Sequence, residues 1–127
     1  MAHLVPRIEY PELVIGLVAP IGTPLTETIS QLRQQFESAN YDVVEIKVTD
    51  IYRFLEPHIK PEEPLDDSDQ IRRYRSYIAY GNQVRSELND GSVLAALTIQ
   101  RIVASRLKAA KSDEEKFTRT VYILNQF

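Results

Sequence analysis

A short apolar run, a loop that contains glycine and an amphipathic segment follow one another near the start of this chain, and they restrict its fold more than any other feature. Residues 13–19 are continuously apolar and rich in β-branched side chains, which predicts a strand buried on both faces. Pro20 and Gly22 end this run. Thr23 and Pro24 are a pair that typically begins a helix, an N-cap followed by proline at the first helical position.

The segment after Pro24 is predicted to be a helix, because its apolar residues recur at spacings of four, three, four and three. These residues are Leu25, Ile29, Leu32, Phe36 and Ala39. The helix is expected to end near Asn40, and residues 43–48 supply a second apolar strand. Residues 13–48 therefore predict one β-α-β unit, in which the crossover is right-handed and the helix packs on a parallel sheet.

The remainder of the chain predicts further helices and a third strand. Thr49 and Asp50 can cap a short helix over residues 51–55, and the prolines and acidic residues of 56–69 predict a mobile loop or lid. We expect helices over residues 69–88 and 92–110, turns at 89–91 and 111–115, and a buried strand over 120–124. The stripe expected on the first of these helices is Ile71, Tyr74, Ile78, Gly81, Val84 and Leu88. The stripe expected on the second is Ala95, Ile99, Ile102, Val103 and Leu107.

Together these elements predict a three-layer α/β/α fold with a parallel sheet, of the P-loop NTPase or nucleotide-kinase-like class. Residues 1–11 are an N-terminal extension, and residues 12–127 form the domain. A complete P-loop kinase sheet usually has more strands than the three predicted here, so the fold is expected to be incomplete at its C-terminus. We expect either a fragment of a longer protein or a subunit whose sheet is completed by other contacts.

The loop after the first strand is the best candidate for a phosphate site, because a strand, a glycine loop and a helix N-terminus present backbone N–H groups to an anion. Against the pattern G-x-x-x-x-G-K-[ST], residues 19–26 keep the final hydroxyl as Thr26, but Leu25 stands in the lysine position. Gly22, Thr23 and Thr26 are the predicted phosphate-binding residues. Anion binding is expected and phosphoryl transfer is not. The alternative is a tight turn with no ligand.

A second candidate cluster lies on the long predicted helix. Arg72, Arg73 and Arg75 precede a Gly81-Asn82-Gln-Val-Arg85 segment, and arginine makes bidentate contacts to phosphate. Glycine within a helix costs about 1 kcal/mol relative to alanine, so another group is expected to approach closely at Gly81. Asn82 and Arg85 are the predicted nucleotide-binding residues here, with Arg85 as the charged partner of the Gly22 loop. The alternative is a solvated basic helix face, which we favour for Arg72 and Arg73, and a glycine that admits a neighbouring helix.

No catalytic or metal-binding residue is predicted. The chain has no cysteine, and its two histidines, His3 and His58, have no partner at ligand spacing. The acidic residues at 66–69 lack the glycine and terminal glutamate of a calcium loop and are expected to form the solvated start of a helix. Asn125 occupies the place where many P-loop enzymes have a magnesium-binding aspartate, and an amide does not replace that carboxylate.

Charge and hydropathy restrict the partners. The net charge of -3 gives no general attraction to nucleic acid or to an anionic membrane. The apolar run at residues 13–19 is too short to span a bilayer, and the N-terminus lacks the charged and apolar regions of a signal peptide. We expect a cytoplasmic protein that binds neither nucleic acid nor membrane.

Residues 12–23, 41–46, 80–85 and 120–124 read ELVIGLVAPIGT, YDVVEI, YGNQVR and TVYIL in this order. In these segments the chain resembles, over residues 12–127, the N-terminal P-loop-kinase-like region of bacterial anti-phage deoxycytidine-nucleotide (dCTP/dCMP) deaminases. The resemblance implies a degenerate phosphate loop at Gly22 and Thr23 and a motif of Gly81, Asn82 and Arg85. It also implies that a zinc deaminase domain, a hydrolase that depletes deoxycytidine nucleotides during infection, follows this region.

The chain has neither H-x-E nor P-C-x-x-C, so the resemblance implies that it is the half that does not deaminate. Zinc is then expected only in the missing C-terminal domain, whereas a magnesium-bound nucleotide is compatible with this half. The implied partners are a nucleotide and that domain or other subunits. Two alternatives from other classes stay open, a nucleoside or nucleotide kinase relative and a non-catalytic interaction module on the same fold.

Overall fold

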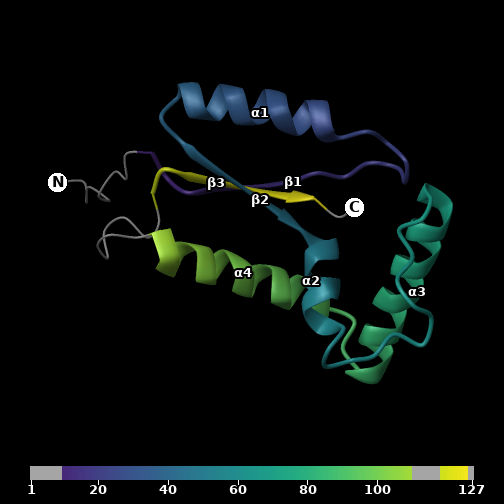
Figure 1. The fold of residues 1–127 in the computed structure, drawn as a ribbon. Coiled ribbons are helices and arrows are strands. Elements are labelled where there is room, and N and C mark those ends of the chain that lie inside the picture. Colours follow the sequence, from purple (N-terminus) through teal and green to yellow (C-terminus); the bar gives the residue numbers. More distant parts are fainter. Residues whose placement is uncertain (1–9, 110–117, 126–127) are drawn as a thin grey trace.

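A computed structural model describes residues 10–109 and 118–125 (Figure 1). The strands of its sheet are β1 (Leu13–Gly16), β2 (Asp42–Lys47) and β3 (Thr120–Asn125). The helices are α1 (Thr26–Ser38), α2 (Val48–Leu55), α3 (Gln70–Glu87) and α4 (Val93–Ala109). All strand pairs are parallel, so the predicted α/β class with three parallel strands and helices around them is confirmed for this part of the chain.

The third strand in sequence is the central strand in space. The strand order is β1-β3-β2, with Ile15 opposite Ile123 and Val44 opposite Tyr122. In the doubly wound sheets that bind dinucleotides or flavin the first two strands are neighbours, so this order differs from both. Figure 1 shows α1 on one face of the sheet and α4 on the other, while α3 stands beside the end where β2 and β3 finish.

Helix α1 packs on the sheet as predicted. Ile29 forms a buried cluster with Val121 and Ile123 of β3, and Leu32 and Phe36 pack against it. The C-terminal end of α1 is closed by backbone hydrogen bonds. The N–H of Asn40 donates to Glu37 O, and that of Tyr41 donates to Phe36 O. Asn40 has φ of 67°, the left-handed conformation that ends many helices.

The predicted start of α1 is wrong. The helix begins at Thr26 with Leu25 at the N-cap, and no side chain caps it. Thr23 is not the cap because its backbone N–H donates to Pro20 O at 3.1 Å in a tight turn. A residue that precedes proline is also disfavoured in the helical conformation, which keeps Thr23 outside the helix.

The prediction that the first strand is buried on both faces is also wrong. Strand β1 lies at the edge of the sheet, and Val14 is 51% exposed. The face of β1 that points away from α1 is open, because α4 packs on that side of the sheet against the other two strands. There Ile102 contacts Ile46 and Tyr122 in a buried cluster. The strand predicted over residues 120–124 is confirmed, since Val121, Tyr122 and Ile123 are fully buried.

The lengths of α3 and α4 agree with the prediction, and their buried faces agree with it only in part. Helix α3 is capped by Asp69, whose side chain accepts a hydrogen bond from the N–H of Arg72 at 2.8 Å. Gly81 and Val84 are buried as predicted, whereas Ile71 is 73% exposed, and α3 also buries Tyr77 and Tyr80. On α4 the buried residues are Leu94, Thr98 and Ile102. The predicted α4 residues that are exposed are Ala95, Ile99, Val103 and Leu107.

Helix α2 follows β2 without a loop and joins the sheet to α3. It begins at Val48 with Lys47 as its N-cap, so the predicted cap at Thr49 and Asp50 is wrong, and Thr49 is buried. The ring of Tyr52 packs against Tyr77 and Tyr80 with centroid distances of 5.7 and 5.6 Å. A further cluster of buried residues, apart from the two on the faces of the sheet, therefore lies among α2, α3 and the start of α4.

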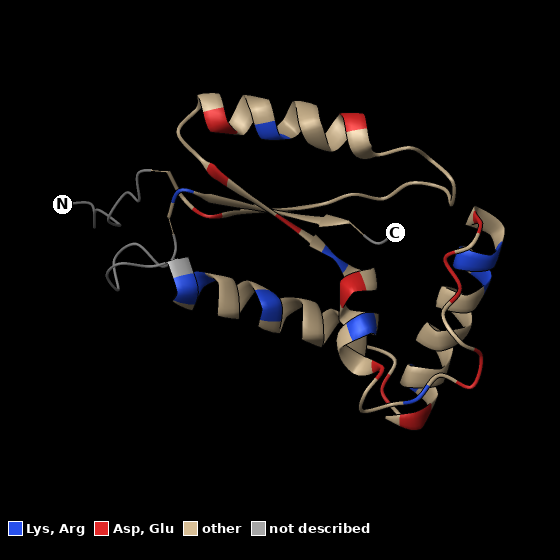
Figure 2. Ribbon diagram, in the orientation of Figure 1, with Lys and Arg blue, Asp and Glu red and all other residues tan. Residues whose placement is uncertain are grey.

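The segment predicted as a mobile lid is fastened to α3. The hydroxyl of Tyr80 donates to Ile59 O at 2.5 Å, and Gln83 bonds both Lys60 O and the N–H of Glu62 at 2.8 Å. Figure 2 shows acidic residues along this segment beside basic residues of α3. The predicted turn at 111–115 and the extension at 1–9, with His3, lie outside the described residues. No helix in the described ranges is both long and apolar enough to span a membrane.

Candidate functional site

The carboxyl ends of the parallel strands meet at one edge of the sheet, where ligands of open α/β folds usually bind. Side chains on a strand alternate between faces, so Glu45, Lys47 and Asn125 all point to the face that α1 covers. The register places Lys47 of β2 directly opposite Asn125 of β3. The loop after β1 and the first turn of α1 lie at the same edge (Figure 1).

Two adjoining cavities of about 240 and about 200 Å³ occupy this edge, and we call them together the sheet-edge crevice. The first is lined by Leu25, Thr26, Glu45, Lys47, Arg73 and Asn125. The second shares Leu25 and Asn125 and adds Leu17, Ile21, Gly22, Thr23 and Tyr74. The crevice therefore joins the loop after β1, the N-terminus of α1, the ends of β2 and β3, and the start of α3.

The loop after β1 holds its glycine in a conformation that other residues rarely adopt. Gly22 has φ of 90°, and an added Cβ would meet no atom within 4 Å, so the backbone conformation and not crowding requires glycine. Because no side chain caps α1, its first-turn N–H groups and the positive end of its dipole face the crevice without a competing oxygen from a cap.

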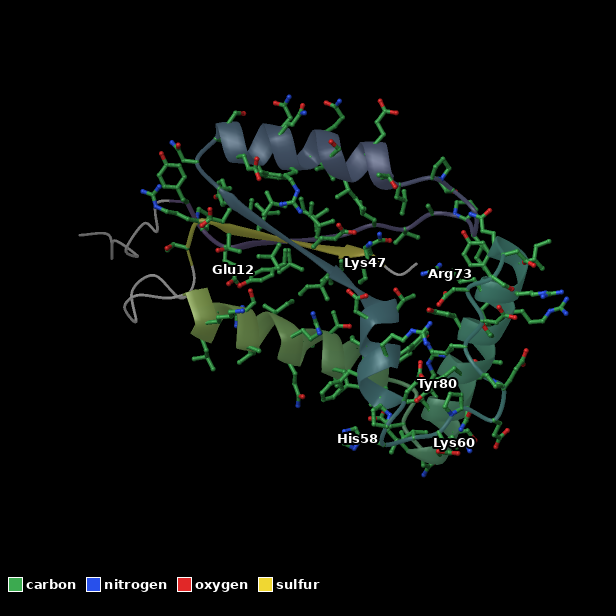
Figure 3. The ribbon with its side chains drawn as sticks, viewed as in Figure 1. Glu12, Lys47, His58, Lys60, Arg73 and Tyr80 are labelled. Carbon is green, nitrogen blue, oxygen red and sulfur yellow. The ribbon has the colours of Figure 1, made fainter. Side chains whose placement is uncertain are left out.

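Two cations reach the crevice from different elements. Figure 3 shows Lys47 at the end of β2 and Arg73 on the side of α3 that faces it. The Nζ of Lys47 lies 4.0 Å from Glu45 Oε1, and the Nε of Arg73 lies 3.4 Å from Asp67 Oδ1. The guanidinium of Arg73 also stacks over the ring of Tyr77, 4.7 Å from its centroid, which fixes its direction.

Among the described residues, no protein group donates a hydrogen bond to Oδ1 of Asn125. The residue is only 6% exposed, and its Nδ2 donates to Glu45 Oε1 at 3.3 Å. Its Oδ1 is the one buried side-chain polar atom without a hydrogen-bond partner among the described residues. Such an atom costs about 1–3 kcal/mol when left unpaired, and it lines both cavities of the crevice.

The predicted site residues fall into two separate places. Gly22, Thr23 and Thr26 line the sheet-edge crevice, whereas Asn82 and Arg85 line another cavity farther along α3. Because a helix rises about 1.5 Å per residue, Arg85 lies about 18 Å from Arg73 along the axis of α3. Arg85 thus lines a different cavity from the Gly22 loop, and Arg73 is the arginine of α3 that lines the crevice.

Sequence reasoning missed three residues of the crevice. The sequence favours a solvated helix face for Arg73, and it predicts for Glu45 and Lys47 only that they belong to a strand. The signal for the latter two was available, because polar residues at 45 and 47 alternate with apolar residues and so share one face. The position of Arg73 depends on how α3 packs, which the sequence does not specify locally.

The acidic residues and histidines do not form a metal centre within the described residues, where no group of three or more potential ligands is found. Asp66 accepts a hydrogen bond from the backbone of Ser68 and Asp69 caps α3. The hydroxyl and backbone N–H of Ser68 hold the pKa of Asp66 below its usual value. The ring of His58 packs 5.9 Å from that of Phe54.

Taken together, the crevice offers backbone N–H groups, two cations, one carboxylate and an unpaired amide oxygen. Such a set suits a ligand that has both an anionic group and a hydrogen-bond donor. Comparison of the chain with family models, curated proteins and solved structures found no match. The chemistry of the crevice therefore has to be interpreted from its own residues.

Proposed function

We propose that this chain is a nucleotide-binding module whose site is the sheet-edge crevice. The observation that carries the proposal is the buried, unpaired Oδ1 of Asn125 beside two cations and an uncapped helix N-terminus. A nucleotide suits this combination, since its phosphates are anionic and its sugar and base carry hydroxyl and amino donors. An inorganic anion without a proton has no donor for Oδ1.

In this proposal the phosphates lie at the first turn of α1, beside Gly22 and Thr26. A helix N-terminus favours an exposed anion by only ~0.3–1 kcal/mol, so specific binding needs further positive charge. Lys47 and Arg73 supply it, and the planar guanidinium of Arg73 suits bidentate contact with phosphate. The Oδ1 of Asn125 then accepts from a hydroxyl or amino group of the same ligand.

We propose binding without phosphoryl transfer. Leu25 stands where the phosphate loop has lysine, and Pro24 has no backbone N–H to donate. Among the described residues that line the crevice, Glu45 is the one carboxylate. Magnesium brought with a nucleotide would therefore rely on Glu45 and on the phosphates, a common arrangement for this ion.

The resemblance to deoxycytidine-nucleotide deaminases suggests what such binding would serve. We propose that the chain is the regulatory, kinase-like module of an anti-phage deaminase and reports nucleotide occupancy to a zinc deaminase domain outside this chain. The P-loop class of the fold, the cytoplasmic location and the partnership with that domain belong to the same proposal. Asn125, where a carboxylate would support phosphoryl transfer, agrees with a binding role.

Calorimetric titration of the full chain with dCTP, dCMP, ATP and inorganic pyrophosphate tests the proposal. We expect a nucleotide to bind more tightly than pyrophosphate, because its sugar and base can donate to Asn125 while its phosphates contact the first turn of α1. Lys47→Met and Arg73→Met should each weaken nucleotide binding about tenfold, the value of one charge-assisted contact. Arg75→Met is the matched control, since Arg75 is exposed on the same helix and lines neither cavity.

Absence of nucleotide binding by the parent chain would reject the proposal. Equal affinity in Arg73→Met and Arg75→Met would move the site away from the crevice. Transfer of the γ-phosphoryl group of ATP to an added nucleoside or nucleotide by the pure chain, abolished by Lys47→Met, would instead establish the kinase alternative.

An interaction module is the second candidate, and one observation favours it. Ile99, Val103 and Leu107 form an exposed apolar stripe on α4, beside the open face of β1 where Val14 is exposed. Parallel sheets are normally covered on both faces, so an open apolar face is typical of an interface. A chain that binds no nucleotide but self-associates in light scattering, with Leu107→Glu restoring the monomer, would support this candidate.

A further inference from the structure

A second cavity, of about 350 Å³, lies among α2, α3 and the start of α4, and we call it the three-helix cavity. Tyr52, Asn82 and Arg85 bring polar groups to it. Its apolar walls include Val48, Ile78 and Leu94. It shares no lining residue with the sheet-edge crevice, so the two are separate sites.

The buried polar side chain in this cavity is Tyr52, which is 3% exposed. Within residues 10–109 and 118–125 no protein group forms a hydrogen bond with its hydroxyl, whose oxygen, unlike Asn125 Oδ1, is not fully buried, and its ring packs against Tyr77 and Tyr80. The hydroxyl fits against the bare backbone of Gly81, where an added Cβ would lie 2.7 Å from Tyr52 Oη. The close approach predicted at Gly81 is therefore that of Tyr52 from the neighbouring helix.

Arg85 brings a positive charge to the same place. Its Nη1 donates to Asn82 Oδ1 at 3.4 Å, and no carboxylate among the described residues forms an ion pair with it. Burial raises the pKa of Tyr52, and the nearby charge of Arg85 lowers it in part. Because burial is the larger effect, the Tyr52 hydroxyl stays protonated at neutral pH and can donate a hydrogen bond.

The third feature is the N-terminus of α4, whose first turn reaches the cavity at Leu94 and Ala95. Asp90 is the acidic residue nearest in sequence to the start of α4, and its carboxylate is hydrogen-bonded to Ser92. Its Oδ1 accepts from the Ser92 backbone N–H at 2.9 Å and from the hydroxyl at 2.7 Å. The dipole of a 17-residue helix and the guanidinium of Arg85 thus both favour an anion there.

We propose that the three-helix cavity is a binding site for a small organic carboxylate with an apolar body. A single guanidinium presents a fork that matches one carboxylate, and the protonated Tyr52 hydroxyl adds a further donor. The aliphatic walls accommodate the uncharged part of the ligand, which inorganic phosphate lacks. This site is independent of the proposed nucleotide site.

The test is ¹⁵N-edited NMR of the full chain during titration with benzoate, with benzamide and inorganic phosphate as comparison ligands. Benzoate should saturate while shifting the amides of Gly81, Leu94 and Ala95, and benzamide should bind at least about tenfold more weakly because it lacks the charge. Inorganic phosphate should leave these amides unchanged. The amides of Gly22 and Thr26, in the crevice, should not respond to benzoate.

Variants separate the proposed contacts from general effects. Arg85→Met should weaken benzoate binding about tenfold, and Tyr52→Phe several-fold, whereas Arg75→Met should change it by less than about twofold. The dispersed spectrum of each variant before titration shows whether it is folded. Equal binding of benzamide, unchanged affinity in Arg85→Met, or no saturable shift at Leu94 and Ala95 would overturn the proposal.

Discussion

At the scale of single residues, two glycines are required for different physical reasons. Gly22 has open space around it but adopts φ of 90°, whereas Gly81 lies in a helix where an added methyl group would strike Tyr52. Sequence patterns place both glycines near candidate sites, but they do not distinguish a conformational requirement from a steric one. Only the steric requirement at Gly81 depends on a neighbouring side chain, that of Tyr52.

We predict that Gly22→Ala lowers the free energy of unfolding by about 1–2 kcal/mol, the cost of left-handed backbone for an L-residue. Gly91→Ala is the matched control, because Gly91 also has open space but no positive φ, and it should change stability by less than about 0.5 kcal/mol. Urea denaturation of both variants measures the difference. Equal losses of unfolding free energy in the two variants would contradict the prediction, because they would mean that residue 22 can leave the left-handed conformation without cost.

For Gly81 we predict a change of sign that depends on Tyr52. In the parent, Gly81→Ala should destabilise the fold by about 1–3 kcal/mol, because the new Cβ would lie 2.7 Å from the Tyr52 hydroxyl. In a Tyr52→Phe background this contact is gone, and the same change should stabilise α3 by up to about 1 kcal/mol through helix propensity. A double-mutant cycle in urea tests this, and additive effects would contradict it.

At the scale of elements, the contact between α3 and the segment before it gives a pH-dependent prediction. Tyr80 is 1% exposed, and its hydroxyl donates to Ile59 O. Burial, with smaller effects of Glu56 and Glu87, raises its pKa above the usual 10.0. Because the pKa is raised in the folded state, the contribution of Tyr80 to the free energy of unfolding is fully present below pH 10.0. It is lost as the pH rises through the pKa of Tyr80 in the folded protein.

Tyr80→Phe should therefore lower the free energy of unfolding by about 1–3 kcal/mol at neutral pH, because the Ile59 carbonyl loses its buried donor. The difference in the free energy of unfolding between parent and variant should narrow as the pH rises above 10.0. In that range Tyr80 of the parent ionises more readily in the unfolded than in the folded state, which destabilises the parent alone. Urea titrations at neutral and alkaline pH measure it. A constant difference across this range would show that Tyr80 does not titrate on unfolding.

Element boundaries were largely predictable, whereas the buried faces of α3 and α4 were predictable only in part. The ends of α3 agree with the prediction because local signals set them, such as the Asp69 cap and the turn at 89–91. Which face of α3 is buried depends on Tyr52, a residue of another helix whose ring it meets. Val84 of the predicted stripe is buried, but Ile71 and Ile78 are exposed, and Tyr77 and Tyr80, which lie outside the stripe, are buried.

At the scale of the whole molecule, half of the candidate site could be foreseen. The strand, loop and helix order indicated Gly22, Thr23 and Thr26, because that geometry is local in sequence. Arg73 and Asn125 join them only through the packing of α3 and the strand order β1-β3-β2. The same packing carries Asn82 and Arg85 away from the loop and into a cavity of their own.

The central claim is that a nucleotide binds at the carboxyl edge of the sheet, and amide chemical shifts measured during titration with dCTP and with ATP test it most directly. For the nucleotide that binds, we predict saturable shifts at Gly22, Thr26 and Asn125, with one dissociation constant for all three. Gly81, Leu94 and Ala95 should stay unchanged, because they border the three-helix cavity. Saturable shifts confined to those last residues, or no saturable shift with either nucleotide, would contradict the claim.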